Sequence, residues 1–384
     1  MNILITVQTY YPKKDGVQMV TQYLAEGLAN SGNKVTVITS THKTLSNYEL
    51  HNRVEIKRVN LNTKYALYFG DKKQYKKLII DEANNNDVLI NVCTQNAFTD
   101  LILKDLKKIK CKKILYLHGM FDFKIHKYDF SSIFNICNKI WKTIRLGYYY
   151  KINKKNFKEY DKVINLHQLC DGYDYFIEKY NQKAEIIENA ADDRFFETSE
   201  EKHTENYFIC VANYLQDKNQ ELCLEAYYKS VSSKNHDMIF IGNRNSKYYY
   251  RLLDINKKFE EKYGKRNVKF LTNIDRDKTI EYIKKAKLYL FGSKHEIFPV
   301  AIVEAMASGI PYLSTDVGCV RALPGGLICK NSDEMAYLID LIISDENLKS
   351  NLKIIGREYA KKHLRIPEKV NQLNEILNSL LYNK

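Results

Sequence analysis

The stretch LYLFGSKHEIFPVAIVEAMASGIPYLST, residues 288–315, is the part of the chain from which the fold can be predicted most directly. Its two ends, 288–293 and 310–315, are apolar runs of strand length. Between them, Pro299 suits the first turn of a helix and Gly309 suits its carboxyl end. Two apolar strands joined by a helix form a parallel pair covered by helices. The stretch therefore predicts part of a parallel sheet in an α/β domain.

The same alternation of apolar strands and helical segments runs along the whole chain. The expected strands are ILITV, KVTVIT, VEIKRV, VLINVC, KKILYLHG and KVINLH, and then YFICVAN, MIFIGN, NVKFLT, LYLFGS, IPYLST and GGLIC. Between the two runs lies an acidic, polar joint, FFETSEEKHTEN, whose residues 198–206 are a candidate hinge. The pattern predicts an α/β protein with two doubly wound, Rossmann-like domains, residues 1–195 and 206–366, which face each other across a cleft.

The last segment, residues 367–384, is predicted to be a separate helix. It carries an apolar stripe at helical spacing, formed by Val370, Leu373, Leu377 and Leu380. Such a stripe needs a packing partner, and the candidate is the N-terminal domain, reached by crossing back over the domain boundary.

Size and composition limit the class of protein. A chain of 384 residues with 45% hydrophobic and 28% charged residues is typical of a folded protein of two domains, and these values exclude a disordered chain. No uncharged apolar run approaches the roughly 18 residues of a spanning helix, and the amino terminus lacks the features of a secretory signal peptide. We therefore expect a cytoplasmic protein. Its eight cysteines include no C-x-x-C pair, so we expect reduced, mostly buried thiols.

Positive charge is concentrated in one part of the chain. The net charge is +14, and between residues 101 and 160 there are 15 Lys and Arg against 4 Asp and Glu. Basic residues alternate there with apolar and aromatic ones: Lys139, Lys142, Arg145 and Lys151 among Phe134, Ile140, Trp141, Ile144 and Tyr148 to Tyr150. This pattern suits peripheral binding to an anionic membrane at the inner face of the plasma membrane, although a solvated charged face or a biased genome composition produces it as well. Nucleic acid is a weaker candidate, because no RNP, KH or zinc-finger pattern accompanies the charge.

Two glutamates in the opening stretch carry the strongest chemical signal. Glu296 lies at a predicted strand end, and Glu304 lies in the short helix among apolar and small residues. A buried carboxylate needs hydroxyl or cationic partners, or must point to solvent. The helix start also presents the backbone amides of Phe298, Val300 and Ala301, which attract phosphate. Carboxylates for hydroxyls beside amides for phosphates indicate a nucleotide sugar, and two ordinary surface glutamates are the alternative.

The segment with these glutamates resembles the E-x7-E signature of retaining glycosyltransferase family 4, of the bacterial surface-polysaccharide type, whose fold is the two-domain GT-B arrangement. The likeness extends along nearly the whole chain. PKKDGVQMVTQYLAEGLANSGNKVTVIT is similar to the family's first glycine loop and helix, LYLHG to its histidine-bearing strand end, and IIENAADDRFF to its Asn-Gly-Val-Asp stretch. VANYLQDKNQE is similar to its phosphate-binding Gly-Arg and Lys stretch, and VKFLTNI to its base-contacting loop. The order of these segments also matches.

The resemblance implies a role for each matching residue. Glu304 would hold the nucleotide ribose, Glu296 would contact hydroxyls of the transferred sugar, and Lys218 would neutralise the leaving diphosphate. His118 would hydrogen-bond to the donor sugar near the reacting carbon. The other implied donor-binding positions are Gly16 in the first loop, Asn213, Ile274 against the base, and the helix start at Phe298, Val300 and Ala301. Without the resemblance, Lys218 would be one more surface lysine and His118 a structural histidine.

The sequence also departs from the family pattern. One of the family's paired glycines is Asp15 here, which adds a negative charge to the first loop. Asn213 replaces an arginine and removes a bidentate phosphate ligand, for which Arg244 and Arg276 are candidate substitutes. Pro299 stands where glycine is common and deletes one amide donor. These departures put the identity of the donor in question more than the class of reaction.

Metal chemistry has little support in the sequence. Asp275-Arg276-Asp277 matches the D-x-D metal motif of an unrelated glycosyltransferase fold, but it precedes the helical segment KTIEYIKKA, where an aspartate is a good N-cap. No H-E-x-x-H, G-x-S-x-G, Walker A or G-x-G-x-x-G pattern occurs in a supporting context. We expect no metal and no cofactor, and a nucleotide-sugar donor for which UDP is favoured over GDP.

The resemblance implies a metal-independent enzyme that moves a sugar, with retention, from a nucleoside diphosphate to a hydroxyl of a glycan or lipid-linked glycan. The expected role is assembly of a bacterial cell-surface glycan such as capsule or lipopolysaccharide. Two alternatives stay open: a GT-B nucleotide-sugar epimerase, and a non-catalytic basic scaffold that binds a membrane or nucleic acid. No motif encodes the acceptor, the linkage or the oligomeric state.

Overall fold

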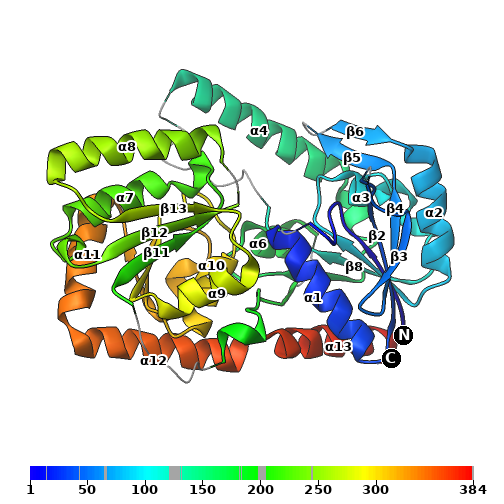
Figure 1. The fold of residues 1–384 in the computed structure, drawn as a ribbon. Helices are drawn as coiled ribbons and strands as arrows, with labels where there is room; N and C mark the ends of the chain where they lie inside the picture. Colours follow the sequence, from blue (N-terminus) through cyan, green and yellow to red (C-terminus); the bar gives the residue numbers. More distant parts are fainter. Residues whose placement is uncertain are drawn as a thin grey trace. The chain divides into compact units, whose positions relative to one another are not determined.

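The computed structural model describes residues 1–13, 15–42, 44–64, 67–120, 130, 132–180, 182, 184–197, 205–243 and 245–382 (Figure 1). The chain divides into two compact units, Met1–Glu188 with Pro367–Lys384, and Asn189–Ile366. Three parts of the sequence analysis lie outside the described residues: 121–129 and 131 of the basic stretch, 198–204 of the candidate hinge, and Arg244.

Within its described residues, the first unit is built on an eight-stranded sheet of order β10-β9-β8-β7-β1-β2-β4-β3. All neighbouring pairs are parallel except β3 with β4. The strands are β1 (Asn2–Thr6), β2 (Lys34–Ser40), β3 (Tyr48–His51), β4 (Val54–Val59), β7 (Val88–Val92), β8 (Lys112–Tyr116), β9 (Lys162–Asn165) and β10 (Ala184–Ile186). A separate antiparallel hairpin consists of β5 (Leu61–Lys64) and β6 (Leu67–Gly70).

Helices accompany the parallel strands of the first unit. They are α1 (Gly16–Asn30), α2 (Lys72–Asn84), α3 (Ala97–Asp100), η1 (Leu103–Lys108), α4 (Ile133–Ile152), α5 (Lys154–Phe157) and α6 (Asp171–Tyr180). The central strands β1, β7 and β8 read as near-continuous apolar runs because helices cover both faces of a doubly wound sheet.

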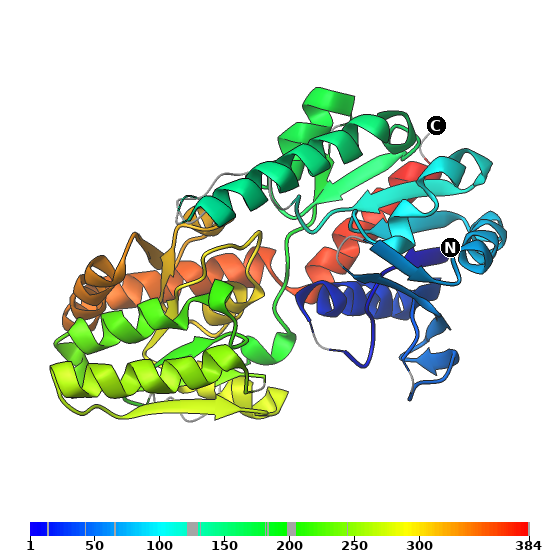
Figure 2. The same cartoon turned by 90° about the horizontal axis from the view of Figure 1, so that it is seen from above.

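The C-terminal helix α13 (Ile366–Tyr382) packs with the first unit from Pro367 onward. Its stripe of Val370, Leu373 and Leu377 is buried, and Figure 2 shows α13 beside α1. The two helices approach closely at Gly27, where an added Cβ atom would lie 2.3 Å from a methyl group of Val370. A side chain at position 27 would therefore force α1 and α13 apart.

The second unit is built on a six-stranded, fully parallel sheet of order β13-β12-β11-β14-β15-β16 among its described residues. The strands are β11 (Tyr207–Val211), β12 (Asp237–Gly242), β13 (Val268–Thr272), β14 (Leu288–Phe291), β15 (Tyr312–Thr315) and β16 (Gly326–Cys329). The helices are η3 (Asp193–Phe195), η4 (Gln216–Lys218), α7 (Gln220–Lys229), η5 (Ser232–Lys234), α8 (Lys247–Tyr263), α9 (Arg276–Lys285), α10 (Val300–Ala307), η6 (Val320–Ala322), α11 (Ser332–Ser344) and α12 (Glu346–His363).

The topology confirms the predicted class, α/β with doubly wound parallel sheets. Each strand expected from the sequence is present, and no end differs from the expected one by more than three residues. In the second unit, strands numbered in chain order lie as 3-2-1-4-5-6, and the parallel strands of the first unit begin in the same way. This arrangement places a topological switch point between β1 and β7 in one sheet and between β11 and β14 in the other. Ligands of such sheets bind beyond the carboxyl ends of the strands at this point.

The cysteines also behave as expected. All eight are free thiols, and those that are buried are Cys111, Cys170, Cys210, Cys223, Cys319 and Cys329. Across the described ranges, no helix combines the length and the apolar composition that crossing a bilayer requires.

Candidate functional site

The candidate site of the second unit lies at its switch point. Lys218 follows β11, and Glu296 follows β14, the strand hydrogen-bonded next to β11. Because parallel strands carry their carboxyl ends at the same edge, the two loops meet there. Lys218 Nζ lies 2.5 Å from Glu296 Oε1. The structure thus brings together two of the residues predicted from the sequence, although 78 positions separate them in the chain.

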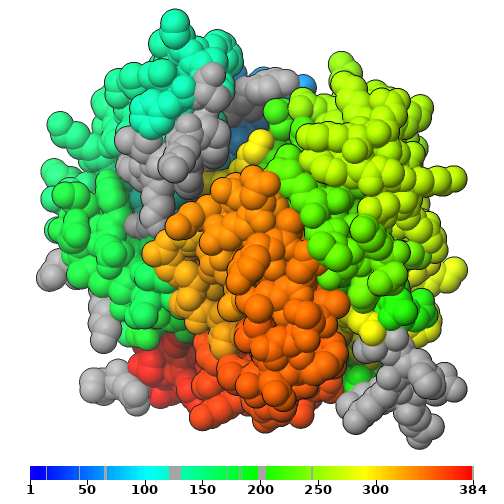
Figure 3. All heavy atoms as spheres, turned by 90° about the vertical axis from the view of Figure 1, so that its left-hand side faces the viewer, coloured from blue at the N-terminus to red at the C-terminus, as the bar shows by residue number. Residues whose placement is uncertain are grey.

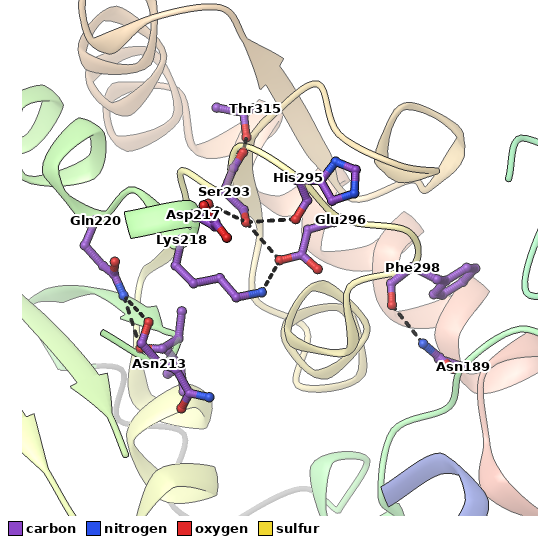
Figure 4. Close-up of polar contacts among 12 residues, drawn as sticks. Asn189, Asn213, Asp217, Lys218, Gln220, Ser293, His295, Glu296, Phe298 and Thr315 are labelled. Carbon is purple, nitrogen blue, oxygen red and sulfur yellow. Dashed lines mark hydrogen bonds and ion pairs between the residues drawn. The ribbon is translucent and has the colours of Figure 1, made fainter. Parts of the chain in front are cut away.

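The Glu296 carboxylate is held from a second side (Figure 4). The hydroxyl of Ser293 donates to Glu296 Oε1 at 2.9 Å, and Ser293 itself is fully buried. The side chains of Lys218 and Glu296 are 29% and 15% exposed. The pair is therefore ordered by hydrogen bonds while it keeps access to solvent, as a site that binds a polar ligand requires.

Backbone contacts fasten the two loops to each other. The amide of Lys294 donates to the carbonyl of Asp217 at 2.8 Å, and the side chain of Asn219 donates to the carbonyl of Gly292 at 3.1 Å. Asn219 has a φ of 50°, in the left-handed region that asparagine tolerates better than most residues. This conformation ends η4 and places Lys218 two residues before the start of α7.

The loop after β15 packs against the backbone of the loop that carries Glu296. Gly318 has a φ of +54°, and a Cβ atom there would lie 2.3 Å from the carbonyl oxygen of Ile297 and 2.8 Å from that of Glu296. The next residue, Cys319, donates its amide to the carbonyl of Ile297 at 3.1 Å. Only glycine fits this close approach at such a φ, so position 318 helps to fix the backbone that carries Glu296.

Glu304 has a cationic partner, as its burial requires. It lies in the middle of α10, and its side chain is 6% exposed. The guanidinium of Arg276 donates to both carboxylate oxygens, the longer contact being 3.4 Å. The same guanidinium lies 5.0 Å from the ring centre of Phe195. Arg276, one of the candidate substitutes for the missing phosphate-binding arginine, is thus bound to Glu304 and stacked on an aromatic ring.

The partner of Glu304 relates this glutamate to the carboxyl edge of the sheet. Arg276 begins α9, in the segment that follows the end of β13. At the neighbouring strands, Tyr289 of β14 is fully buried, and its hydroxyl donates to the carbonyl of Val211, at the end of β11, at 2.9 Å. Burial is the main cause that raises the pKa of Tyr289 well above its usual value, and the charge of Glu304 contributes to the same rise.

The start of α10 presents backbone amides, as predicted. Pro299 is the N-cap residue, and Val300 begins the helix. The first amides of any helix have no intrahelical acceptor, which makes this end suitable for an anion. The carbonyl of Phe298 accepts a hydrogen bond of 2.8 Å from the side chain of Asn189 (Figure 4). Phe298 is buried, whereas Val300 and Ala301 are half-buried.

Asn213 and Ile274 flank this edge. Asn213 is exposed, and its backbone carbonyl accepts from the side chain of Gln220 at 3.0 Å. Ile274 is half-buried in the loop after β13, directly behind Asn273, which has a φ of 55°. An apolar side chain held partly open in a loop is a suitable surface for stacking a base.

His118 lies in the first unit, behind the end of β8, and is 5% exposed. Burial lowers its pKa to about 4, so the ring is neutral near pH 7. Its Nε2 atom is buried and has no hydrogen-bond partner among the described residues. In a neutral imidazole one ring nitrogen donates a hydrogen bond and the other accepts one, so Nε2 can bond to a hydroxyl group in either role. A buried nitrogen without a partner is suited to such a bond.

Gly16 and Asp15 form the start of α1 rather than an open loop. Asp15 is the N-cap, accepts from the amide of Gln18 at 3.0 Å, and forms a capping box with it. The hydroxyl of Thr9 also donates to the Asp15 carboxylate, at 3.1 Å. The negative charge foreseen in this loop thus stabilises a helix terminus. A Cβ atom at Gly16 would meet open space.

The Asp-Arg-Asp sequence is a helix start, as the analysis of the sequence favoured. The Asp275 side chain accepts from the amide of Lys278 and caps α9, while Asp277 binds Arg194. The residues the structure describes contain no group of three or more His, Cys, Asp or Glu side chains arranged to hold a metal ion.

Sequence comparison identifies related proteins. A family model described as glycosyl transferases group 1 matches residues 191–359. N-acetyl-alpha-D-glucosaminyl L-malate synthase of Bacillus anthracis is 22% identical over 393 residues, which cover 97% of this chain and 96% of that protein. The capsular polysaccharide biosynthesis glycosyltransferase CapH of Staphylococcus aureus is 27% identical over 118 residues, 30% of this chain and 32% of that protein.

Structure comparison agrees with the fold. HepE of Anabaena, solved in complex with UDP-glucose, has a TM-score of 0.69 and 16% identity, covering 99% of this chain and 100% of that chain. The fold is GT-B. Together these matches support placing this chain in the glycosyltransferase superfamily.

Several residues of this edge carry no role predicted from the sequence. Ser293 and Asn189 hold the Glu296 loop and the Phe298 carbonyl, and Gly318 supports the same loop. The sequence contained a usable signal for Gly318 alone, since a glycine in the short loop after a strand commonly marks a turn or a close backbone approach.

Proposed function

We propose that this protein is a retaining glycosyltransferase that takes a nucleoside diphosphate sugar as donor and binds it at the carboxyl edge of the second unit. The observation that carries the proposal is the pairing of both signature glutamates with cations, Glu296 with Lys218 and Glu304 with Arg276. These pairs combine acceptors for hydroxyl groups with donors for phosphate beside the amides of α10. A nucleoside diphosphate sugar carries both kinds of group.

The chemistry follows from the charges. The bond between the anomeric carbon and the phosphate oxygen breaks, and the acceptor oxygen bonds to the same face of the sugar. The acceptor proton passes to the departing phosphate oxygen, which leaves a free nucleoside diphosphate. Negative charge grows on this leaving group, and the Lys218 ammonium together with the α10 amides at Val300 and Ala301 stabilises it in place of a metal ion.

The two glutamates act on hydroxyl groups of the donor. Glu304, fixed from one side by Arg276, accepts from the ribose, and Glu296 accepts from the transferred sugar. In the first unit, the neutral, buried ring of His118 is suited to a hydrogen bond with a hydroxyl group of the substrate.

UDP is the favoured nucleotide. HepE was solved with UDP-glucose and shares the fold over the whole chain, and Ile274 offers a half-buried apolar side chain for the base. The match to a glycosyltransferase of capsular polysaccharide biosynthesis supports a cell-surface glycan, or a lipid-linked precursor of one, as the acceptor.

Calorimetric titration of the purified protein with UDP and with GDP tests donor binding. We expect UDP to bind, and the Glu304→Gln variant to bind it at least about tenfold more weakly, because one charge-assisted hydrogen bond is lost. Glu261→Gln is the matched control, since Glu261 is exposed on α8. Equal UDP binding by Glu304→Gln and the control would contradict the assigned site.

The anomeric configuration of the product, observed by NMR spectroscopy during turnover with an acceptor, tests the stereochemistry. The proposal expects the configuration of the donor to be kept. Inversion would refute the retaining mechanism, and release of an altered nucleotide sugar without an acceptor would show an epimerase instead.

A further inference from the structure

Helix α4 presents an apolar face to solvent. Ile133, Cys137, Ile140, Ile144 and Tyr148 follow one another at steps of three or four residues, the spacing of one helix face. The large side chains of this face and its margins are between 53% and 82% exposed: Ile133, Phe134, Ile140, Trp141, Ile144, Tyr148 and Ile152. We call this set the α4 face. Contiguous exposed apolar surface of this kind marks an interaction site.

The opposite side of α4 is the one that packs on the first unit. Leu146 and Tyr150 are fully buried in its core. The hydroxyl of Tyr149 donates to Asp100 Oδ1 at 2.6 Å, and Tyr68 of the β5–β6 hairpin donates to the same carboxylate. One face of the helix is therefore fixed to the core of the first unit, and this packing leaves the apolar residues of the other face exposed to solvent.

This packing corrects part of the pattern seen in the sequence. Lys139, Tyr149 and Tyr150 were counted with the outward basic and aromatic residues, but Lys139 and Tyr150 are buried and Tyr149 is half-buried. The outward surface is therefore more apolar than the sequence indicated. In Figure 3, atoms in the teal range of the colour bar, which includes α4, lie at the surface of the first unit.

The charged residues of α4 and α5 all have one sign. From Ile133 to Phe157 the sequence contains no Asp or Glu, while Lys142, Arg145, Lys151, Lys154 and Lys155 all occur within it. The ammonium-bearing residues Lys151, Lys154 and Lys155 are exposed. The Arg145 guanidinium lies 5.6 Å from the ring centre of Trp141, so charge and aromatic surface meet on the same side of the helix.

We infer that the α4 face binds the surface of a lipid bilayer that contains anionic phospholipids, with the helix lying along the interface. Apolar and aromatic side chains enter the boundary between headgroups and acyl chains, and the flanking lysines contact the anionic headgroups. A second copy of this chain is a poorer occupant, because two such surfaces would bring like charges together. The inference does not depend on the proposed catalytic function, since it uses none of the residues of the candidate site.

The single tryptophan of the chain gives a direct measurement, because it is Trp141 and it is 62% exposed. Vesicles of phosphatidylglycerol and phosphatidylcholine should shift its fluorescence to shorter wavelength and protect it from iodide quenching. Vesicles of phosphatidylcholine alone should do neither. Protection that appears without vesicles and grows with protein concentration would instead show that a second copy covers the face, and would overturn the inference.

Paired substitutions distinguish vesicle binding by the α4 face from nonspecific adsorption through any exposed apolar side chain. Ile140→Ser with Ile144→Ser keeps Trp141 and should weaken sedimentation with anionic vesicles at least about tenfold, because two apolar side chains lose their insertion. The matched control is Ile354→Ser with Ile355→Ser on α12, where both residues are also more than half exposed. Equal loss in the two double variants would count against the α4 face.

Charge reversal tests the electrostatic part. Lys154→Glu with Lys155→Glu should reduce binding to anionic vesicles, and about 1 M NaCl should reduce binding of the unsubstituted protein, since the Debye length then falls to about 3 Å. Lys257→Glu with Lys258→Glu makes the same charge change at exposed positions of α8 and should leave binding within about twofold. Binding that ignores both salt and the α5 lysines would refute an anionic surface as the partner.

Discussion

At the carboxyl edge of the six-stranded sheet, the candidate site is formed by charged side chains in pairs, whereas two buried polar side chains that follow β8 and end β9 in the eight-stranded sheet are uncharged. The first edge holds Lys218 with Glu296 and Arg276 with Glu304. The second holds the neutral ring of His118 and the side-chain amide of Asn165, whose atoms are buried and lack hydrogen-bond partners among the described residues. The two groups of side chains thus differ in charge, although the parallel strands of both sheets begin in the same order.

The difference shows what each edge can stabilise. Fixed cations beside amides favour a ligand that is anionic or becomes so, and they need little reorganisation when charge develops. Uncharged buried donors and acceptors favour hydroxyl groups, which they bind without the desolvation penalty of a charge. The paired charges of the second unit therefore suit a diphosphate together with the hydroxyl groups that its glutamates can accept, and substitutions can test the contribution of each charge.

The largest expected effect comes from breaking the buried pair at Glu304. Glu304→Ala leaves the Arg276 guanidinium without its carboxylate, and the free energy of unfolding should fall by about 3 kcal/mol. Denaturant unfolding of the second variant, Glu304→Gln with Arg276→Gln, should show much of that stability restored, because no unpaired charge is left. UDP binding should stay weak in both. Recovered UDP binding in the double variant would remove Glu304 from the donor site.

The next effect concerns the leaving group. Lys218→Ala should lower kcat about 100-fold or more, as the loss of one preorganised electrostatic contact does in other enzymes, with a smaller change in KM. Steady-state kinetics measures this split. Lys258→Ala, at an exposed lysine of α8, is the control and should keep full activity. A Lys218→Ala enzyme with unchanged kcat would mean that the charged edge acts in binding and not in the transition state.

Substitution of Gly318, which packs against the Glu296 loop, should have an intermediate effect on stability. Gly318→Ala forces a Cβ atom against the carbonyls of Ile297 and Glu296 at a φ of +54°, and it should lower stability by about 2 kcal/mol. Thermal unfolding and UDP titration should both report the change. Gly16→Ala is the comparison at the other edge, because open space surrounds that position, and it should leave the melting temperature nearly unchanged. A Gly318→Ala protein with wild-type stability would show that the loop can relax.

The smallest effect is a pH dependence that belongs to the uncharged edge. Burial lowers the pKa of His118 to about 4 in the folded protein, so between its ordinary value near 6.5 and 4 the unfolded chain binds more protons than the folded one. Stability from this group is therefore complete above pH 6.5 and is lost as the pH falls. Between pH 8 and pH 6 the unsubstituted protein should lose about 1 kcal/mol more than His118→Gln. Identical pH slopes would mean that His118 is not buried as a neutral ring.

Much of the fold could be predicted because the pattern that specifies it is local. Runs such as YFICV and DMIFIG are apolar over their whole length, which identifies central parallel strands without knowledge of their neighbours. The strands that escaped prediction were β3, β5, β6 and β10, which are edge strands or the separate hairpin. Their sequences are short and mixed in polarity, because an edge strand buries less surface than a central one.

The site was predictable to the extent that it follows strand ends. The sequence predicted a strand end at Glu296, and the resemblance to a known family singled out Lys218; two adjacent strands then bring them together. The partner of Glu304 was less accessible: its burial required a cation or a hydroxyl, but the choice of Arg276 depends on how α9 packs beside α10. Which face of α4 is exposed could not be predicted either, because α4 carries apolar and aromatic residues on both faces, and its sequence alone does not determine which face packs on the core.

The chain passes from the first unit to the second near Ala191 and returns near Arg365, and these two residues are joined by a β-bridge. The amide of Ala191 also donates to the carbonyl of Leu364 at 3.0 Å. Residues 189–366 therefore form a unit that is inserted into the sequence of the first unit, and the two ends of the insertion lie next to each other. Exchange of this segment between relatives would need only two adjacent junctions and would cut no strand of either sheet.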